Sequence, residues 1–319
     1  MNTVESGWQT RLWRAVSEYL GLVAVLAALV LVFRLLAGRP LPFQSIMDRV
    51  PTDLICAVGM TFVLVIGGID LSVGSVLALS SAVLGVCVVE AKLPVPVAIA
   101  GCLGAGLVCG AANGLVTIRW GLPSFIVTLG MLEIARGGAY LVTHMRTQYI
   151  GPKIQGVAEA SVCGISAPFF VALVIVILGQ FVLTRTVFGR YAIAIGTNEE
   201  AVRLSGIDPR PIKLVVFMLC SGLTALAAVM HTSRFGGADP NAGVGFELQA
   251  IAAVVIGGTS LMGGRGSVVA SFFGVLIIAV LGAGLNQLGA QEPVKRLVTG
   301  LVIVAAVIAD QYRQRLKPR

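Results

Sequence analysis

The chain has 319 residues, of which 57% are hydrophobic and only 12% are charged, whereas soluble domains carry about 25% charged residues. The apolar residues form long continuous runs, which exclude a soluble domain and also a membrane β-barrel, whose strands alternate. The net charge of +8 lies mostly near the ends of these runs and indicates membrane topology, with no nucleic-acid partner. The expected fold class is all-α, a polytopic bundle of helices in lipid, because each helix satisfies its own backbone polar groups there.

The first expected element is a retained transmembrane helix. Residues 1–14 form a short polar N-terminus, and the apolar run 15–37 is too long for the apolar region of a signal peptide. No small-x-small cleavage site follows this run. We therefore expect residues 1–14 to be cytoplasmic and the helix to persist in the mature protein.

Ten apolar segments are candidates for membrane helices, given that a span needs about 20 residues. The second and the eighth are short, and each ends in a Gly-Gly pair, so we expect these two to be broken or re-entrant. The number of spans is therefore expected to be about ten, with a range of eight to ten, in a single membrane domain over residues 1–319. The segments are 15–37, 51–67, 73–90, 94–118, 121–143, 166–184, 212–232, 247–262, 267–289 and 293–310.

Ten spans place both termini on the same side of the membrane. On that side, Lys and Arg are more frequent than on the other. Because positively charged residues are retained in the cytoplasm, this bias predicts a cytoplasmic polar segment at 184–211 and a cytoplasmic tail at 311–319.

Small residues recur at four-residue spacing in two of the segments, 94–118 and 73–90. Such stripes allow close helix packing in lipid, so they predict packing and not function. Their members are Gly106, Gly110 and Gly114 in the first, and Gly74, Ala78 and Ala82 in the second.

The two short segments share a weak internal sequence repeat. Val65–Gly68 recurs as Val255–Gly258, and each is followed by a Gly-Ser-Val start to the next helix. Paired Gly-interrupted segments in two halves of a transporter indicate a substrate path. Chance similarity between glycine-rich membrane helices is the alternative.

Placing a polar side chain at membrane depth costs free energy, so each such residue is expected to have a structural or functional role. Glu133 and Arg136 stand three residues apart on one helix, where they are expected to neutralise each other; lining a path is the alternative. Asp70 and Ser72 follow Gly67-Gly68, where they either cap the next helix or belong to a gate or coupling interface. The candidates for a translocation path or gate are Asp70, Ser72, Asn113, Glu247, Gln249 and Asn286.

The sequence lacks the motifs of several other functions. There is no G-x-x-x-x-G-K-[ST] loop for ATP, no H-E-x-x-H and no C-x-x-C, and only two histidines are present. No row of intramembrane carboxylates, such as a proton-driven carrier needs, is found either. We expect no catalytic, cofactor or metal site in this chain.

The polar segment 184–211 is the one sizeable inner loop. Thr197 or Asn198 can cap a short helix from Glu199 to about Leu204, whose acidic first turn suits the helix dipole. Ser205-Gly206 can end that helix. The segment is expected to be either a docking helix on the cytoplasmic surface or a solvated connector.

Four stretches, taken together, resemble the ribose-type permeases of bacterial ABC importers. They occur in the right order and cover about residues 50 to 310, which makes the resemblance specific. The stretches are Phe188–Ile207, Ala57–Ser75, Pro123–Met131 with Arg136-Gly137, and Leu248–Gly266.

The resemblance implies a homodimer, or a pair of sister permeases, in the lipid of a bacterial inner membrane, with one path between the two copies. It also implies a cytoplasmic ABC ATPase that carries the ATP and a periplasmic sugar-binding protein that delivers the substrate. The segment 186–207 is similar to the family's coupling helix. The residues implied in contact with the ATPase are Gly189, Gly196, Asn198, Glu199, Ser205 and Gly206.

The chain departs from ribose permeases mainly in its first fifty residues and in the outer loop 143–168. The sugar therefore stays open, and similar permeases carry xylose, galactose, nucleosides, autoinducer-2 or branched-chain amino acids. Two other classes are alternatives. One is an ion-coupled secondary carrier, and the other is an intramembrane enzyme that uses Glu133, Arg136 or Asp70.

Overall fold

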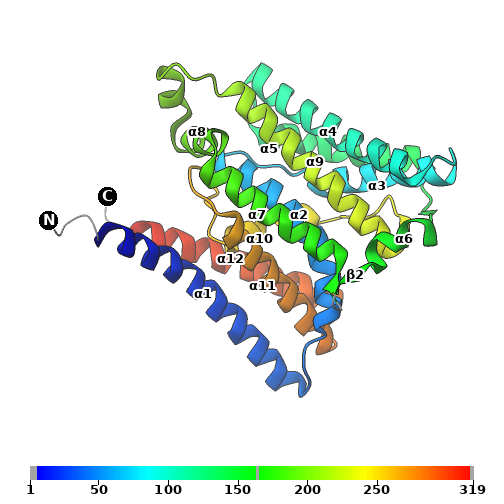
Figure 1. Ribbon diagram of the computed structural model, residues 1–319, viewed down its shortest axis with the longest axis horizontal. Helices are drawn as coiled ribbons and strands as arrows, with labels where there is room; N and C mark the ends of the chain where they lie inside the picture. The colour runs from blue at the N-terminus through cyan, green and yellow to red at the C-terminus, as the bar shows by residue number, and fades with distance from the viewer. Residues whose placement is uncertain (1–5, 163–164, 317–319) are drawn as a thin grey trace.

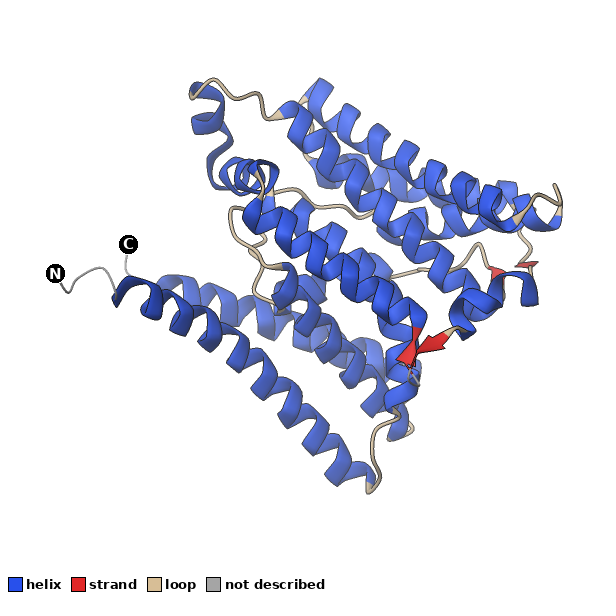
Figure 2. Ribbon diagram, viewed as in Figure 1, coloured by secondary structure: helices blue, strands red, loops and turns tan. Residues whose placement is uncertain are grey.

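Helices make up nearly all of the part of the chain that the computed structural model describes, residues 6–162 and 165–316 (Figures 1 and 2). The all-α membrane bundle expected from the sequence is confirmed. The helices are α1 (Ser6–Ala37), α2 (Phe43–Val65), α3 (Val73–Val89), α4 (Val95–Trp120), α5 (Ser124–Val142), α6 (Pro152–Glu159), α7 (Ala167–Arg185), α8 (Val187–Leu204), α9 (Arg210–Phe235), α10 (Phe246–Ile256), α11 (Val268–Gln287) and α12 (Glu292–Leu316).

Each of the ten expected segments corresponds to one helix, and α6 and α8 are additional. By length and composition, six helices within the described residues could cross a membrane, while α3 and α10 are shorter apolar helices. The 11 residues of α10 rise about 16 Å, roughly half of a hydrocarbon core. The six helices are α4, α5, α7, α9, α11 and the Tyr19–Ala37 part of α1.

The second segment differs from its expected bounds. We expected it to begin at Pro51, but the helix begins at Phe43 and has 23 residues, with Pro51 inside it. It is therefore long enough to span, and the expected interruption lies only at its end. After Val65 the chain is not helical again until Val73.

The two ends of the bundle differ in what they carry. The start of α1, the end of α12 and α8 lie at one end, and α6 with the short strands lies at the other (Figure 1). At the α6 end, β1 (Gln148–Tyr149) pairs antiparallel with β4 (Gly237–Ala238), and β2 (Ser161–Val162) pairs with β3 (Ile165–Ser166). The first pair ties the loop after α5 to the end of α9.

The glycine stripe of α4 packs directly on α9. A Cβ at Gly110 would lie 2.6 Å from the carbonyl oxygen of Phe217 and 2.8 Å from the Cα of Met218. Gly106 and Gly114 also face α9 at similarly short distances. The predicted close-approach stripe is confirmed, and only glycine permits this spacing between the two helices.

The polar segment 184–211 is more helical than expected. A helix from Glu199 was predicted, but the preceding residues 187–197 are helical as well. Thr186 caps this first part by accepting a hydrogen bond from the backbone N–H of Gly189 at 3.2 Å. The segment is therefore a folded surface element and not an extended connector.

Candidate functional site

Helix α8 has two parts that meet at a sharp kink at Asn198. The backbone of Asn198 is extended, with φ −163° and ψ 96°, and its Oδ1 accepts a hydrogen bond from the backbone N–H of Ala201 at 3.0 Å. This is the geometry of a helix N-cap. Of the two candidate caps, Asn198 is the one used, because Thr197 donates its hydroxyl to the carbonyl oxygen of Ile193.

The second part of α8 ends where the sequence predicted. Gly206 has φ +86°, and its N–H donates to the carbonyl oxygen of Arg203 at 3.0 Å. The N–H of Ile207 reaches back to the carbonyl oxygen of Val202 at 3.3 Å, which completes a Schellman motif after Ser205. The short helix is therefore closed at both ends by its own residues.

Charged side chains cover the exposed face of this short helix. Glu199 pairs with Lys213 of α9 at 3.0 Å, and Glu200 pairs with Arg203. The hydrogen bond and the charge of Glu200 hold the pKa of Arg203 above its ordinary value. A groove of about 510 Å³ runs between this helix, the end of α4 and the start of α9. Exposed ion pairs add little stability, so they mainly present a charged surface.

The first part of α8 meets two other elements at a contact that we call the glycine junction, made of Gly67, Gly196, Gly263 and Gly264. A Cβ at Gly196 would overlap the carbonyl oxygen of Val65 and lie 2.5 Å from the backbone N of Gly264. That N–H donates to the same Val65 oxygen at 2.9 Å. The junction joins α8 backbone to backbone with the end of α2 and with the loop after α10, so α8 cannot move without moving them.

Gly189 holds α8 against α7 in a similar way. A Cβ there would overlap the carbonyl oxygens of Val182 and Leu183. All six residues implied in coupling therefore lie in α8 or at its end, where the structure brings them together at one end of the bundle (Figure 1).

The interruption between α2 and α3 is held by hydroxyl groups of α5. The N–H of Ile69 donates to Ser124 Oγ at 2.9 Å, and the N–H of Leu71 donates to Thr128 Oγ1 at 3.0 Å. Thr128 Oγ1 also bonds the carbonyl oxygen of Ile69 at 3.1 Å. Irregular backbone at membrane depth is tolerated where protein surrounds it. Sequence reasoning missed both hydroxyl residues, because they belong to a distant segment.

Three of the expected path residues form one buried chain. Asp70 Oδ1 accepts from the backbone N–H of Ser72 at 2.8 Å and from its hydroxyl at 2.6 Å, and Asn113 Nδ2 donates to Ser72 Oγ at 3.0 Å. All three residues are completely buried. Asp70 is not the N-cap of α3, because Ser72 occupies that position. The Asp70 side chain instead closes a local turn just before the helix.

The other three expected path residues lie apart. Glu247 is in the first turn of α10, with its Oε2 2.5 Å from where a Cβ of Gly74 would stand. Gln249 lines a small space beside Asp53, and Asn286 lines a groove near the end of α11. Of these three, only Glu247 lies near the hydrogen-bonded residues Asp70, Ser72 and Asn113, because it contacts Gly74 at the start of α3.

The internal sequence repeat is matched by similar backbone geometry. Gly67, with φ +75°, and Gly258, with φ +88°, each end their helix in a left-handed residue followed by a Schellman-type hydrogen bond. The positions differ by one residue between Val65–Gly68 and Val255–Gly258. Both helix ends lie next to the glycine junction. Gly67 is itself part of the junction, and the loop that follows Gly258 contains Gly263 and Gly264.

The expected pairing of Glu133 with Arg136 is wrong. Within the described residues no ion pair joins them; instead Arg136 Nη1 donates to the carbonyl oxygens of Pro240 at 2.6 Å and Ala242 at 2.8 Å. Glu133 is exposed on α5. The guanidinium does not pair with Glu133, because two carbonyl groups of the loop before α10 accept hydrogen bonds from its Nη1. That loop is distant in sequence.

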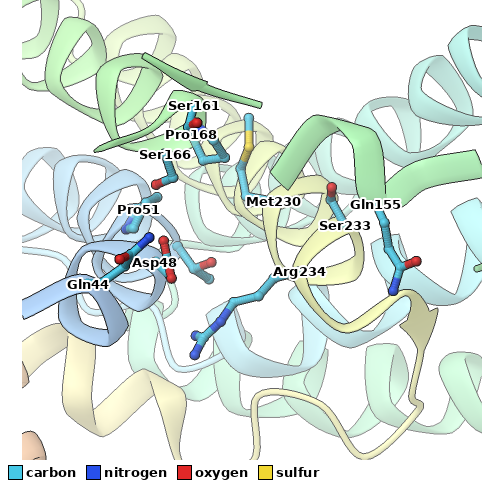
Figure 3. A pocket seen from close by; sticks show the side chains of 11 residues that line it. Gln44, Asp48, Pro51, Gln155, Ser161, Ser166, Pro168, Met230, Ser233 and Arg234 are labelled. Carbon is cyan, nitrogen blue, oxygen red and sulfur yellow. The ribbon is translucent and has the colours of Figure 1, made fainter. Parts of the chain in front are cut away.

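A polar cavity of about 330 Å³ lies at the α6 end of the bundle (Figure 3). Arg234 extends into it opposite Gln44 and Asp48, and Ser233 and Gln155 lie on the α6 side. None of the expected path residues lines it. Sequence reasoning missed this cavity because its walls come from α2, α6, α7, α9 and two short strands.

A bundle of lipid-embedded helices, interrupted by buried polar segments and carrying a folded charged helix at one end, defines a membrane permease. The chain matches the family described as "Branched-chain amino acid transport system / permease component" over residues 43–307, and it belongs to that family. It is therefore a transport subunit of an ABC system and not an enzyme. This excludes the intramembrane enzyme and the ion-coupled carrier.

Individual relatives are similar over most of their length. The ribose import permease protein RbsC of Haemophilus influenzae is 40% identical, with 84% of each chain covered. The ribose import permease protein RbsC of Bacillus subtilis is 39% identical, with 86% of each covered. The fructose import permease protein FrcC of Rhizobium meliloti is 34% identical, covering 85% of this chain and 78% of its own. No solved structure matches the chain.

Proposed function

We propose that this permease moves a monosaccharide such as ribose inward across a bacterial inner membrane. The observation that carries the proposal is the similarity to import permeases named for ribose and fructose over nearly the whole bundle. A second permease copy, the same or a sister chain, completes the path. A separate ABC ATPase supplies the energy, and a periplasmic sugar-binding protein supplies the substrate. The family's description makes a branched-chain amino acid the second candidate.

The end of the bundle that carries α8 faces the cytoplasm in this proposal, together with both termini. Two observations support this orientation. Lys and Arg favour this side, and α8 presents a capped, charged helix beside an open groove. The α6 end, with its polar cavity of about 330 Å³, then faces the delivery protein.

The glycine junction is the route by which ATPase movement reaches the path. ATP binding closes the ATPase pair and displaces α8. Because Gly196 touches the backbone of Val65 and Gly264, the displacement passes to the end of α2 and to the loop after α10. These two elements lead into the α2–α3 interruption and into α11. A permease fed by a tight delivery protein needs only a weak site of its own, so alternating access of this bundle suffices for transport.

Replacing Asn198 by alanine tests the coupling role. The change removes the N-cap of the short helix, which costs about 0.5–2 kcal/mol of helix stability. We expect ATPase activity stimulated by the loaded binding protein, and ribose uptake with it, to fall about fivefold in proteoliposomes that contain all three components.

The matched control is Asn198→Asp, which keeps the capping oxygen and should keep most of the activity. Full coupled transport by Asn198→Ala would contradict the assignment of α8. Uptake by the permease alone, driven by an ion gradient, would contradict the proposed ABC mechanism. Competition by branched-chain amino acids, but not by sugars, would favour the second candidate.

A further inference from the structure

A polar stripe runs along the exposed side of α5. Glu133, Arg136 and Tyr140 stand at positions i, i+3 and i+7 of this otherwise apolar helix, so their side chains share one face. Thr128 and Ala135, on another face of α5, are buried against the bundle. Glu133 is exposed on the outside of the chain, whereas Arg136 and Tyr140 are half-buried and reach the loop before α10.

Glu133 cannot face lipid at low cost. It lies near the middle of α5, where a charged carboxylate costs about 2.5–3.5 kcal/mol in hydrocarbon on insertion scales. The residue is exposed, and within the described residues no ion pair involves its carboxylate. Water or a polar partner must therefore cover this part of α5 in the membrane.

The loop before α10 extends the stripe with ordered polar groups. The hydroxyl of Tyr140 donates to Asn241 Oδ1 at 2.9 Å, and Asn241 in turn donates from its backbone N–H to Asp239 Oδ1 at 2.9 Å. Arg136 donates to the carbonyl oxygens of Pro240 and Ala242 in the same loop. A guanidinium, carboxylates, an amide and a phenol thus meet on one surface.

Two glycines of α5 leave open space next to the stripe. Nothing lies within 4 Å of a Cβ placed at Gly130 or at Gly137, whereas Gly138 already packs on Leu79. Small residues one above the other on an exposed helix face allow another helix to approach closely in lipid. A second permease copy seated there would leave the stripe bordering the gap between the two chains.

We infer that this surface is the sugar-contact surface of the translocation path. The inference rests on the proposed function, because it assumes that a second copy completes the path. Carboxylates accept hydrogen bonds from the vicinal hydroxyl groups of a sugar, amide and phenol groups both accept and donate, and a guanidinium donates. The residues assigned are Glu133, Arg136 and Tyr140 of α5 with Asp239 and Asn241.

The test compares Glu133→Gln and Tyr140→Phe with Ile134→Gln, which adds an amide to the neighbouring apolar side of α5. Each variant is reconstituted with the ATPase and the ribose-loaded binding protein, and uptake of radiolabelled D-ribose is measured per ATP hydrolysed. We expect Glu133→Gln to lower this ratio about tenfold and Tyr140→Phe about fivefold, as for a lost hydrogen bond to a charged and to a neutral group. Stimulated ATP hydrolysis should stay at the wild-type level in both.

Two results would overturn the inference. An unchanged ratio in both variants would show that the stripe does not contact the sugar. An equal loss in Ile134→Gln would show that any polar change on α5 disturbs the bundle. Failure of the proposed function looks different, because the wild-type system itself would then show no ATP-dependent ribose uptake.

Discussion

Replacing Gly196 by valine is expected to abolish coupled transport and to destabilise the α8 end of the bundle. The new side chain would overlap the carbonyl oxygen of Val65 and crowd the backbone N of Gly264, so the hydrogen bond between them must break or α8 must move away. Overpacking of this kind costs about 3 kcal/mol where backbone and not a flexible side chain stands in the way. Both stimulated ATP hydrolysis and sugar uptake should fall at least about tenfold, with a lowered melting temperature in detergent.

Gly104→Ala is the matched control, since it adds a Cβ to a glycine within α4 where nothing lies within 4 Å. We expect this variant to transport normally and to melt no lower than the wild type, because alanine favours a helix more than glycine does. Normal coupled transport by Gly196→Val would show that α8 does not act through the glycine junction.

Local features of this chain were predictable from the sequence. The cap at Asn198, the end at Gly206 and the glycine stripe of α4 each depend on residues within a few positions of one another, where backbone geometry and residue type are directly linked. The resemblance then added the partners and the role of α8.

Contacts between distant segments were not predictable in the same way. Arg136 and Glu133 satisfy the spacing of a helical ion pair, yet Arg136 binds carbonyl groups about a hundred residues away. The hydroxyl groups of Ser124 and Thr128 hold a segment more than fifty residues earlier in the chain. No local pattern marks such pairs, because any small polar residue on the right face of α5 would serve.

The early start of α2 has a different cause. The second segment was expected to begin at Pro51, because the continuous apolar run begins there. In the structure it lies eight residues into α2, after a first stretch that contains Asp48 and Arg49. Charged residues at the end of a helix reach water while the helix itself continues, so hydropathy alone placed this boundary too late.

Asp70 should tolerate asparagine and not alanine. Asp70→Ala removes the acceptor for both the backbone N–H and the hydroxyl of Ser72 and leaves a buried donor without a partner, which costs about 1–3 kcal/mol. We expect its transport to fall at least about tenfold. Asp70→Asn keeps an Oδ1 for both bonds. Its new Nδ2 takes the place of the buried Oδ2, which accepts no hydrogen bond within the described residues, so one unpaired amide donor replaces one unpaired carboxylate oxygen and most of the transport should remain.

The comparison separates a structural turn from a charged gate. Asp208 makes the same kind of turn, accepting from the N–H of Arg210 at 3.0 Å, but at an exposed position. Asp208→Ala should therefore lower the melting temperature much less than Asp70→Ala, because water replaces the lost acceptor only at the surface. Loss of transport in Asp70→Asn with an unchanged melting temperature would mean that the negative charge itself works in the path. The chain of Asp70, Ser72 and Asn113 would then be part of the gate that the glycine junction moves, and not its support.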